Sequence, residues 1–384
     1  MGRFRDALAR PGLGAIAEIK RRSPSAGELR PDADPAALAA AFGDAGAAAI
    51  SVLVDDRFAG SVDDLRAART ATETPLLAKG FFSRESELDE LRAAGADAVL
   101  LLLRDLDDRR AAALLEHAER LGLDALVEAH DAPELERAGA LDARVVGVNA
   151  RDLGTFAIDR RRALDLVRSA PRDCVVVAES GVLARAHAAA AELAGAAAIL
   201  VGTALMRASD PAAKLRELLA RPLVKVCGLT REEDVAAAAE AGADMAGFIL
   251  ARETPRRAPA VLPVPDTMLS VAVYVGERGD APSDLAQLYP RENGHRARDG
   301  RLFRGGEEVA SVVDRAWAAE DPEHLERARR AEGRVMLAGG LSPENVGEAI
   351  AAVRPWAVDA SSSLELAPGI KDHERVRAFV EAAR

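Results

Sequence analysis

Cysteine is scarce in this chain of 384 residues and occurs only at Cys174 and Cys227. Two cysteines cannot build a disulfide framework, and such usage fits a reducing cytoplasm. The six histidines show no paired spacing of the kind that holds a structural zinc ion. The sequence therefore predicts no metal site, and no cofactor-binding motif is found in it.

An excess of basic residues is also missing, because the formal net charge is −11 at pH 7. This charge argues against a general nucleic-acid or anionic-membrane binder, although a local basic pocket for a small anion is compatible with it. The longest strongly apolar run, 98–103, is too short to span a bilayer, and the opening MGRFRDALARPG lacks the apolar core of a signal peptide. We expect a cytoplasmic protein with small-molecule ligands; its oligomeric state stays open, and a monomer is compatible with the sequence.

Short apolar runs are what the sequence has in abundance. Eight candidate strands lie between Gly14 and Thr203, and they are nearly continuous in apolar character, as parallel strands buried on both faces are. The runs are GAIAEIK, AAAISVLV, PLLAKGF, DAVLLLL, DALVEAH, RVVGVNARD, CVVVAESG and AAAILVGT. Amphipathic segments such as 83–94 and 109–121 separate them. Eight βα units in this length predict a closed (β/α)₈ barrel.

The pattern restarts after Arg221-Pro222 with six clear strands: VKVCGLT, AGFIL, SVAVYVG, EVASVVD, RVMLAGG and WAVDASS. We therefore predict an α/β protein of two tandem (β/α)₈ TIM barrels, residues 1–221 and 222–384, with the second shortened or remodelled. Region 280–310 is atypical and lacks a good βα unit. There NGHRARDGRLFRGGEEVASVVD predicts a polar loop followed by a β-hairpin that turns at Gly305-Gly306.

Charged side chains gather at the predicted carboxyl ends of the strands, where barrels of this kind carry their active sites. The first barrel places there Glu18, Lys20, Lys79, Glu128, Asn149, Arg151 and Glu179. Any one of them is compatible with a rim salt bridge, but the set favours acid–base chemistry on a polyanion. A lysine crowded by another cation and partly desolvated is expected to have a lowered pKa, and a carboxylate screened from water a raised one.

Small and hydroxylic residues end the last two strands of the first barrel, at Ser180-Gly181 and Gly202-Thr203. The loops after strands 7 and 8 are the usual phosphate site of this fold, and glycines let backbone N–H groups approach an anion. The loop 23–27, with Ser23 and Ser25, is another candidate oxygen-binding loop, although Ser-Pro is often simply a turn.

The second barrel repeats this arrangement with other chemistry. Cys227 ends its first strand, and a thiolate there could remove a proton from carbon next to an imine; the alternative is a small core residue. A partner acid would come from Asp314 or Asp359. The remaining candidates bind anions: Arg256, Gly339, Gly340, Ser361 and Ser362. Cys174 starts its strand and receives no role.

At this point the motifs resemble two known families. AEIKRRSPSAG, LLAKGF, LVEAH, GVNARDL, AESGV and LVGTALM resemble indole-3-glycerol-phosphate synthase over residues 4–217. KVCGLT, TPRRA, LAGGLSPENV and VDASSSLELAPGIKD resemble phosphoribosylanthranilate isomerase at 223–276 and 334–372. The whole chain is thus similar to the bifunctional tryptophan-biosynthesis proteins that join both enzymes in this order.

The resemblance implies two consecutive reactions. The second barrel would isomerise N-(5-phosphoribosyl)anthranilate by an Amadori rearrangement, with Cys227 as base and Asp314 as acid. The first would cyclise, decarboxylate and dehydrate the product, 1-(2-carboxyphenylamino)-1-deoxyribulose 5-phosphate, to indole-3-glycerol phosphate. By similarity Lys79 is the acid, Glu128 the base, and Lys20 engages substrate and shares in proton donation. The resemblance assigns the rest of the site to Glu18, Asn149, Arg151, Glu179 and Ser180. It assigns phosphate binding to Ser25, Gly181, Gly202 and Thr203. Neither step needs a cofactor or metal.

The chain departs from these families in ways that leave alternatives open. Gly80 follows Lys79 where the synthases carry aspartate, and Gln287-Leu288-Tyr289 stands where the isomerases read Gln-Leu-His. Only 15 residues precede Ile16, so the synthases' N-terminal extension is much shortened. The isomerases' glycine-rich loop after the acid strand is not found, and one or two βα units are missing. One alternative is a synthase whose C-terminal barrel is catalytically inactive and serves to bind or stabilise. Another is an unrelated phosphate-binding barrel, such as an aldolase that forms a Schiff base on Lys79 or Lys20.

Overall fold

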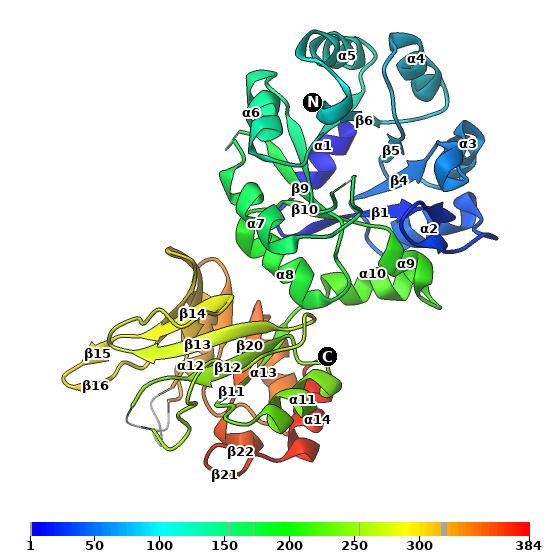
Figure 1. The fold of residues 1–384 in the computed structure, drawn as a ribbon. Coiled ribbons are helices and arrows are strands. Elements are labelled where there is room, and N and C mark those ends of the chain that lie inside the picture. Colours follow the sequence, from blue (N-terminus) through cyan, green and yellow to red (C-terminus); the bar gives the residue numbers. More distant parts are fainter. Residues whose placement is uncertain (1, 153, 172, 253, 316–320) are drawn as a thin grey trace. The chain divides into compact units, whose positions relative to one another are not determined.

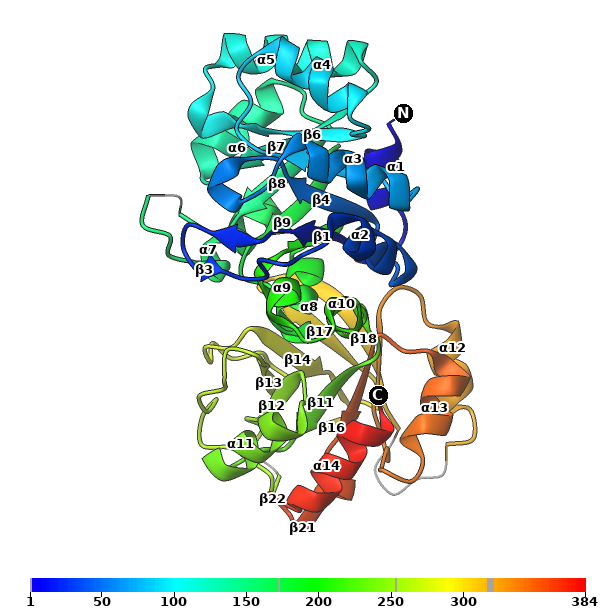
Figure 2. The same cartoon turned by 90° about the vertical axis from the view of Figure 1, so that its right-hand side faces the viewer.

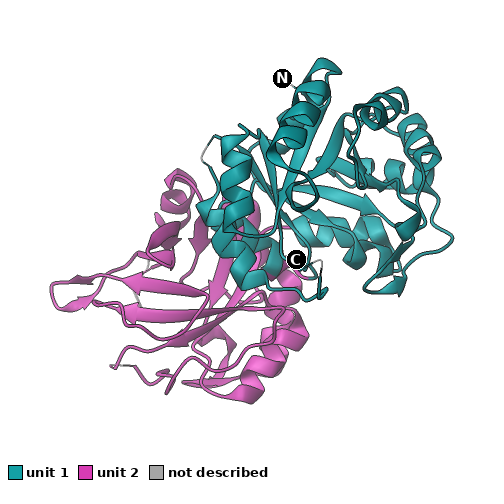
Figure 3. Cartoon of the chain, turned by 45° about the horizontal axis from the view of Figure 1, so that its top comes forward, with its two compact units in different colours: residues 1–183, 187–219 teal, residues 184–186, 220–384 magenta. Residues whose placement is uncertain are grey.

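The computed structural model describes residues 2–152, 154–171, 173–252, 254–315 and 321–384. The chain divides into two compact units, residues 1–183 with 187–219 and residues 184–186 with 220–384 (Figure 3). Each unit contains a closed barrel of eight strands, which confirms the predicted fold class. No helix in the described ranges is both long and apolar enough to cross a membrane.

The barrel of the first unit is wholly parallel, and neighbouring strands pair in an order that closes on itself (Figure 1). Register is fixed at closure by pairs such as Ile16↔Leu200 and Ile16↔Ala49. All eight predicted strands are present as β1 (Gly14–Ile19), β4 (Ala49–Leu53), β5 (Leu76–Lys79), β6 (Ala98–Leu102), β7 (Asp124–Ala129), β8 (Val145–Asn149), β9 (Val175–Glu179) and β10 (Ala198–Val201). In the loop after β1, the short strands β2 (Arg22–Ser23) and β3 (Gly27–Glu28) pair with each other.

Helices cover the outside of this barrel (Figure 2), and several of them start at a carboxylate or hydroxyl that caps the first turn. They are α2 (Pro35–Asp44), α3 (Val62–Ala71), α4 (Glu85–Ala93), α5 (Asp108–Arg120), α6 (Ala132–Ala140), α7 (Arg160–Ser169), α8 (Arg185–Ala194), α9 (Thr203–Arg207) and α10 (Pro211–Leu219). The Asp107 carboxylate, for example, accepts the Arg110 N–H at the start of α5.

Two apolar layers hold this unit together. One lies between strands and helices and includes Ile50, Leu65 and Leu114, all fully buried. The other fills the barrel interior, where Phe4 and Leu8 of α1 (Arg3–Leu8) join the inward-facing strand residues. Since α1 packs against the amino ends of the strands, the carboxyl ends are left to form the mouth.

The second barrel has eight strands, two more than the six predicted. They are β11 (Leu223–Cys227), β12 (Met245–Ile249), β13 (Leu269–Val275), β14 (Leu285–Tyr289), β17 (Gly300–Arg304), β18 (Glu307–Val313), β19 (Val335–Leu337) and β20 (Ala357–Ala360). Its described helices are α11 (Glu232–Ala241), α12 (His324–Arg330), α13 (Val346–Val353) and α14 (His373–Ala382). Strand β14 was missed, and β17 was predicted only as the first arm of the hairpin and not as a barrel strand. Both are short and interrupted by polar residues such as Gln287 and Arg301.

Strand β17 runs antiparallel to both of its neighbours, β14 and β18. The predicted hairpin with its turn at Gly305-Gly306 is confirmed, because Arg304 pairs with Glu307 across that turn. The polar loop predicted before it was wrong in part. Residues 291–296 form a second hairpin, β15 (Arg291–Glu292) with β16 (His295–Arg296), around an Asn-Gly turn with positive φ at both central residues. The second barrel is therefore remodelled, as expected.

Candidate active sites

A cavity of about 750 Å³ opens at the carboxyl ends of the strands in the first unit. Residues from every strand end and from the loops 23–26 and 151–158 line it. Among the predicted site residues it is lined by Glu18, Lys20, Ser23, Ser25, Lys79, Glu128, Asn149, Arg151, Ser180, Gly181, Gly202 and Thr203. Glu179 reaches the same place through Lys79. The structure thus brings the whole predicted set of this barrel together.

Lys79, the last residue of β5, is the centre of this site. Its Nζ lies 2.6 Å from Glu179 Oε2, 3.5 Å from Glu18 Oε2 and 3.8 Å from Glu128 Oε2. These carboxylates come from β9, β1 and β7, so only the closed barrel brings them to one lysine. Three buried acids around one cation give a site that holds and moves protons.

The pKa of Lys79 corrects the prediction made from sequence. Burial alone would lower it, but the carboxylates of Glu179, Glu18 and Glu128 outweigh burial and raise the pKa above its ordinary value. The sequence had suggested crowding by a second cation. Lys20 is instead turned to Glu18, with its Nζ 2.6 Å from Glu18 Oε1, so Lys79 is surrounded by negative charge.

The carboxylates differ from one another. Burial raises the pKa of Glu179, and the nearby Glu128 adds to that effect against the opposing pull of Lys79. Burial would also raise the pKa of Glu128, but His130, Lys79 and Asn149 together lower it. Glu179 therefore favours the protonated form, whereas Glu128 stays ionised.

Glu128 is held by two neighbours. Asn149 Nδ2 donates to Glu128 Oε1 at 2.9 Å, and His130 Nε2 lies 3.1 Å from the same oxygen. Burial would lower the pKa of His130, but Glu128 and Glu134 raise it to about 9. The imidazolium and the amide thus fix the Glu128 carboxylate from one side and leave its other oxygen toward Lys79. Sequence reasoning missed His130, although it follows the quoted motif LVEAH directly.

Backbone features make room for these side chains. A Cβ at Gly202 would overlap Glu18 Oε1 and lie 2.9 Å from Lys20 Nζ, and a Cβ at Gly147 would overlap the Glu179 carboxylate. Ser180 adopts φ 66°, a left-handed conformation that costs a serine about 1 kcal/mol or more and is typical of functional sites. At Gly80, a Cβ would lie 2.8 Å from the Phe82 ring, so the aspartate of the synthases has no room here unless Phe82 moves.

The rim of this mouth combines an oxygen-binding corner with an apolar wall. Ser23 Oγ and Ser25 Oγ are 2.9 Å apart, and Arg151 Nη1 donates to Ser25 Oγ at 3.1 Å. The wall was not foreseen: the rings of Phe58 and Phe81 stack with centroids 6.4 Å apart, and the Arg57 guanidinium lies 3.5 Å above Phe81. A flat aromatic acid that carries a phosphate would satisfy both parts.

In the second unit, Cys227 lies beside a buried ion pair. Lys225 Nζ is 2.7 Å from Asp359 Oδ2, and Lys225 shares the inward face of β11 with Cys227 two residues on. Burial raises the pKa of the Cys227 thiol, and Lys225 opposes this rise. The resting group is thus a thiol rather than the thiolate suggested from sequence. Lys225 was missed, although its spacing from Cys227 was a usable signal.

Asp314, at the end of β18, is surrounded by donors. Tyr289 O–H donates to Asp314 Oδ2 at 2.9 Å, Arg296 Nη1 lies 3.0 Å from the same oxygen, and the Arg315 N–H donates to Oδ1 at 2.7 Å. A Cβ at Gly339 would lie 2.5 Å from Asp314 Oδ1. Burial raises the pKa of Tyr289, and the charges of Asp314, Asp359 and Cys227 add to that rise. Tyr289 therefore remains a hydrogen-bond donor.

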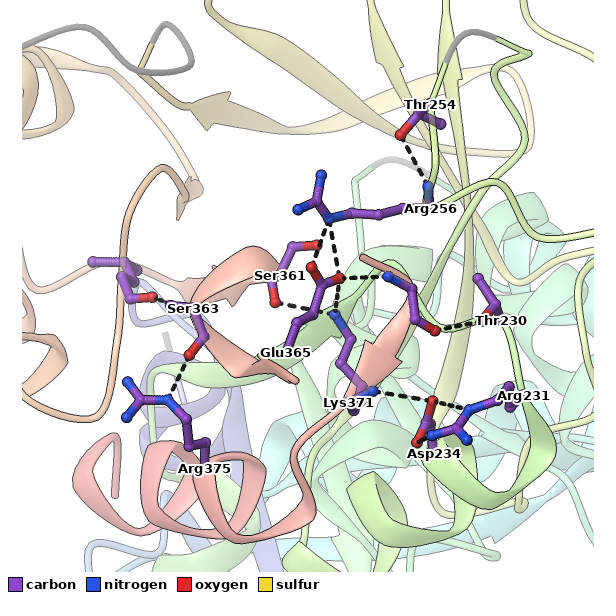
Figure 4. A network of polar contacts seen from close by, with 12 residues as sticks. Thr230, Arg231, Asp234, Thr254, Arg256, Ser361, Ser363, Glu365, Lys371 and Arg375 are labelled. Atoms are coloured by element: carbon purple, nitrogen blue, oxygen red, sulfur yellow. Dashed lines mark hydrogen bonds and ion pairs between the residues drawn. The ribbon is translucent and has the colours of Figure 1, made fainter. Parts of the chain in front are cut away.

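A third cluster joins Arg256 to the predicted phosphate residues (Figure 4). Arg256 Nε donates to Glu365 Oε2 at 2.9 Å, and Lys371 Nζ donates to Glu365 Oε1 at 2.9 Å and to the Ser361 carbonyl at 3.0 Å. A Cβ on Gly228 would lie 2.7 Å from Ser361 Oγ. The Ser361 hydroxyl is buried and has no hydrogen-bond partner in the described structure. Glu365 and Lys371 were missed, although both stand in the quoted VDASSSLELAPGIKD.

The remaining predicted anion binders flank this cluster. Gly339 and Gly340 both have positive φ after β19, and Ser362 begins the 3₁₀ turn η3 (Ser362–Leu364) after β20. Both segments lie at carboxyl ends of barrel strands, where the sequence placed them.

Comparison with known proteins gives two family matches. Residues 2–218 match the model for indole-3-glycerol phosphate synthase, and residues 319–382 match the model for N-(5'phosphoribosyl)anthranilate (PRA) isomerase. An indole-3-glycerol phosphate synthase of a Nocardioides species is 50% identical over 208 residues, which cover 54% of this chain and 80% of that protein.

One further relative aligns with the whole chain, and one solved isomerase matches part of it. A multifunctional tryptophan biosynthesis protein of Phanerodontia chrysosporium is 32% identical over 509 aligned residues, covering 100% of this chain and 64% of that protein. The solved phosphoribosyl anthranilate isomerase of Thermus thermophilus is 26% identical; the match covers 42% of this chain and 97% of that one, with a TM-score of 0.34.

Proposed function

Because the chain belongs to the indole-3-glycerol phosphate synthase family and its C-terminal part matches the isomerase model, we propose that it catalyses two consecutive steps of tryptophan biosynthesis. It is a lyase and an isomerase in one chain. Residues 1–221 carry the synthase and residues 222–384 the isomerase. The observation that carries the synthase assignment is the convergence of Glu18, Glu128 and Glu179 on Lys79 in one cavity.

In the synthase reaction, a carbon of the anthranilate ring attacks the keto carbon of the ribulose chain, carbon dioxide leaves, and a hydroxyl then leaves as water. Lys79 donates a proton to the keto oxygen as the ring closes, since its raised pKa keeps it an ammonium ion. The protonated Glu179, 2.6 Å away, can return a proton to Lys79. Ionised Glu128 stabilises developing positive charge and takes up the proton lost in dehydration. Lys20 and Glu18 engage the substrate beside them.

The rim orients the substrate. The corner of Ser23, Ser25 and Arg151 offers hydroxyl and guanidinium donors, and the loops at Ser180-Gly181 and Gly202-Thr203 supply backbone N–H groups for a phosphate. The stacked Phe58 and Phe81 form an apolar surface of the kind that an anthranilate ring would contact.

In the isomerase reaction, protonation of the ribose ring oxygen opens the sugar to an imine, and removal of the proton on C2 then gives an enolamine that tautomerises to the ketone. Asp314 is the proton donor and Cys227 the base. Lys225 favours the Cys227 thiolate on which the second step depends. Arg256 binds the anthranilate carboxylate, and the free Ser361 hydroxyl and the turn at Gly339-Gly340 bind phosphate.

We further propose that the partners of the protein are its two small sugar-phosphate substrates, and that it binds neither nucleic acid nor membranes. Its compartment is the cytoplasm. A monomer suffices, because each unit supplies its own site. No cofactor or metal is assigned to either reaction.

Separate assays of both half-reactions on the full chain test the proposal. Lys79→Ala and Glu128→Gln are each expected to lower cyclisation by roughly 10²–10⁴-fold, because proton transfer is lost, and to leave isomerisation unchanged. Cys227→Ala is expected to do the reverse. Lys214→Ala, on α10 beside Glu217, is the matched surface control.

Three results would contradict parts of the proposal. Near-normal cyclisation in both variants of the first unit would refute its site. A wild-type chain without isomerisation would support the inactive second barrel instead. Borohydride trapping with a keto-sugar phosphate is expected to give no adduct; an adduct on Lys79 or Lys20 would support the aldolase alternative.

A further inference from the structure

The reversal of β17 places one hairpin at the mouth of the second barrel. A strand parallel to β14 would require the chain to cross back to the amino end first, usually through a helix. Because β17 runs the other way, the chain passes from β14 to β17 at the carboxyl end, where Tyr289 and Asp314 also lie. That connection consists of the β15–β16 hairpin, which ends in Arg296.

Arg296 reaches from this hairpin into the site. The hairpin itself is exposed, but the Arg296 side chain is only 32% exposed and that of Asp314 12%. Arg296 Nη1 lies 3.0 Å from Asp314 Oδ2, and its guanidinium lies 4.2 Å from the centre of the Tyr289 ring. The contact with Asp314 fixes the position of the guanidinium group, and the contact with the Tyr289 ring fixes the orientation of its plane.

Tyr289, the last residue of β14, contacts Asp314 from the barrel wall. It is buried, accepts a hydrogen bond from Gln287 Nε2 at 2.8 Å, and donates its own proton to Asp314 Oδ2 at 2.9 Å. A single carboxylate oxygen thus receives two donors, one from a barrel strand and one from the hairpin. The other oxygen, Oδ1, accepts a hydrogen bond from the adjacent Arg315 N–H.

We infer that Arg296 and Tyr289 are positioning residues for the isomerase acid Asp314, and that the β15–β16 hairpin is part of that active site. The inference rests on the proposed isomerase activity. Arg296 and Tyr289 set the direction in which the Asp314 carboxyl faces the substrate, because both contact the same carboxylate oxygen.

Other charges also act on Asp314, and the hairpin adds to them. The Asp314 N–H donates to Asp299 Oδ1 at 3.0 Å, and Arg327 donates to the Asp314 carbonyl at 2.7 Å. Asp359 on β20 is close enough for Asp314 to raise its pKa. Removing Arg296 therefore takes away one of the two side-chain donors to Asp314 Oδ2 and leaves these other contacts in place.

The test is the separate measurement of isomerase kcat and KM in Arg296→Gln, Arg296→Lys and Tyr289→Phe. Because an acid that is poorly aimed transfers its proton more slowly, we expect Arg296→Gln to lower kcat roughly tenfold and to leave KM nearly unchanged. Tyr289→Phe should act in the same direction by less. Arg296→Lys should restore only part of kcat, because lysine keeps the positive charge but lacks the planar group that stacks on the Tyr289 ring.

Controls separate this inference from its premise. Synthase activity of the same preparations reports that the chain is folded, and Arg291→Gln changes an exposed arginine on the same hairpin. A wild-type chain without isomerisation refutes the proposed function of the second unit and this role with it. An active wild type whose Arg296→Gln and Tyr289→Phe variants keep the wild-type kcat refutes the positioning role alone. Tyr289→Phe removes one hydroxyl at nearly constant volume and leaves the hairpin sequence unchanged. It therefore tests the positioning role even where Arg296→Gln disturbs the hairpin.

Discussion

The two units build their sites from the same strand ends but surround them differently. The first barrel keeps eight parallel strands with helices between them. In the second, the chain between β14 and β18 consists of the β15–β16 hairpin and one reversed strand, β17. Both nevertheless present acid–base side chains at the carboxyl ends. The comparison teaches that strand order and direction at the mouth, rather than a complete coat of helices, fix where the chemistry lies.

The electrostatics of the two mouths are opposite in sense. In the first, three carboxylates surround one ammonium group, so the pKa of Lys79 rises and one acid, Glu179, is driven toward its protonated form. In the second, several donors surround one carboxylate, Asp314, and a lysine lies under the thiol of Cys227. One mouth thus gathers carboxylates around a lysine, and the other gathers hydrogen-bond donors around one carboxylate.

The largest expected effects come from two glycine substitutions, one at each candidate active site. A Cβ at Gly147 would overlap the Glu179 carboxylate, and one at Gly247 would lie 2.8 Å from Cys227 Sγ and 2.9 Å from Lys225 Cε. We expect Gly147→Ala to lower cyclisation about a hundredfold and Gly247→Ala to lower isomerisation comparably, since small misplacements of reacting groups have such effects. Steady-state assays of both reactions on each variant measure this.

The matched control for that pair is Gly306→Ala, because a Cβ there meets open space. It should leave both rates unchanged. If either active-site variant lowers both reactions equally, the two sites are not independent in the way proposed.

The titration of Cys227 would sharpen the contrast between the mouths. Burial raises its pKa, Lys225 lowers it, and Asp359 raises it by less than Lys225 lowers it. Replacing the pair together by Lys225→Met and Asp359→Leu should therefore raise the pKa further while avoiding an unpaired buried charge. The rate of alkylation by iodoacetamide against pH, in a Cys174→Ser background, should shift to higher pH. A shift to lower pH would show that Lys225 does not support the thiolate.

The smallest expected effects concern helix caps, where the units should behave alike. Asp107 caps α5 in the first unit and Asp372 caps α14 in the second, each accepting backbone N–H groups of the first turn. Alanine at either position should lower the free energy of unfolding by about 1 kcal/mol. Denaturant titration of each variant measures this, and both catalytic rates should stay at the wild-type level. A rate change in either would mean that its helix helps to shape a mouth.

The first unit could be predicted from sequence nearly in full, because its strands are short continuous apolar runs and its polar residues stand directly after them. The second could not. Strand β14 carries Gln287 at its centre and β17 alternates with exposed arginine, so neither has the apolar run of a buried parallel strand. Asn293-Gly294 was a usable hairpin signal that the polar composition around it obscured.

Site residues followed the same division. Lys225 could have been found, because it stands two positions before Cys227 in the same strand, and side chains two positions apart point to the same face. Arg296 could not, because its place at the mouth depends on the direction of β17, which no local pattern states. The raised pKa of Lys79 likewise required distances between residues from four strands, and spacing along the chain does not contain them.

The reversed strand also bears on how a barrel can lose length. Deleting a whole βα unit would leave seven strands and an unpaired edge. Turning one strand around instead replaces two long crossovers by one tight turn, at Gly305-Gly306, and one hairpin, β15–β16, and it keeps the ring closed. A lineage, or an engineer, could shorten such a protein by this route without reopening its sheet. The short connection then falls beside the reacting groups, where new side chains can be tried one at a time.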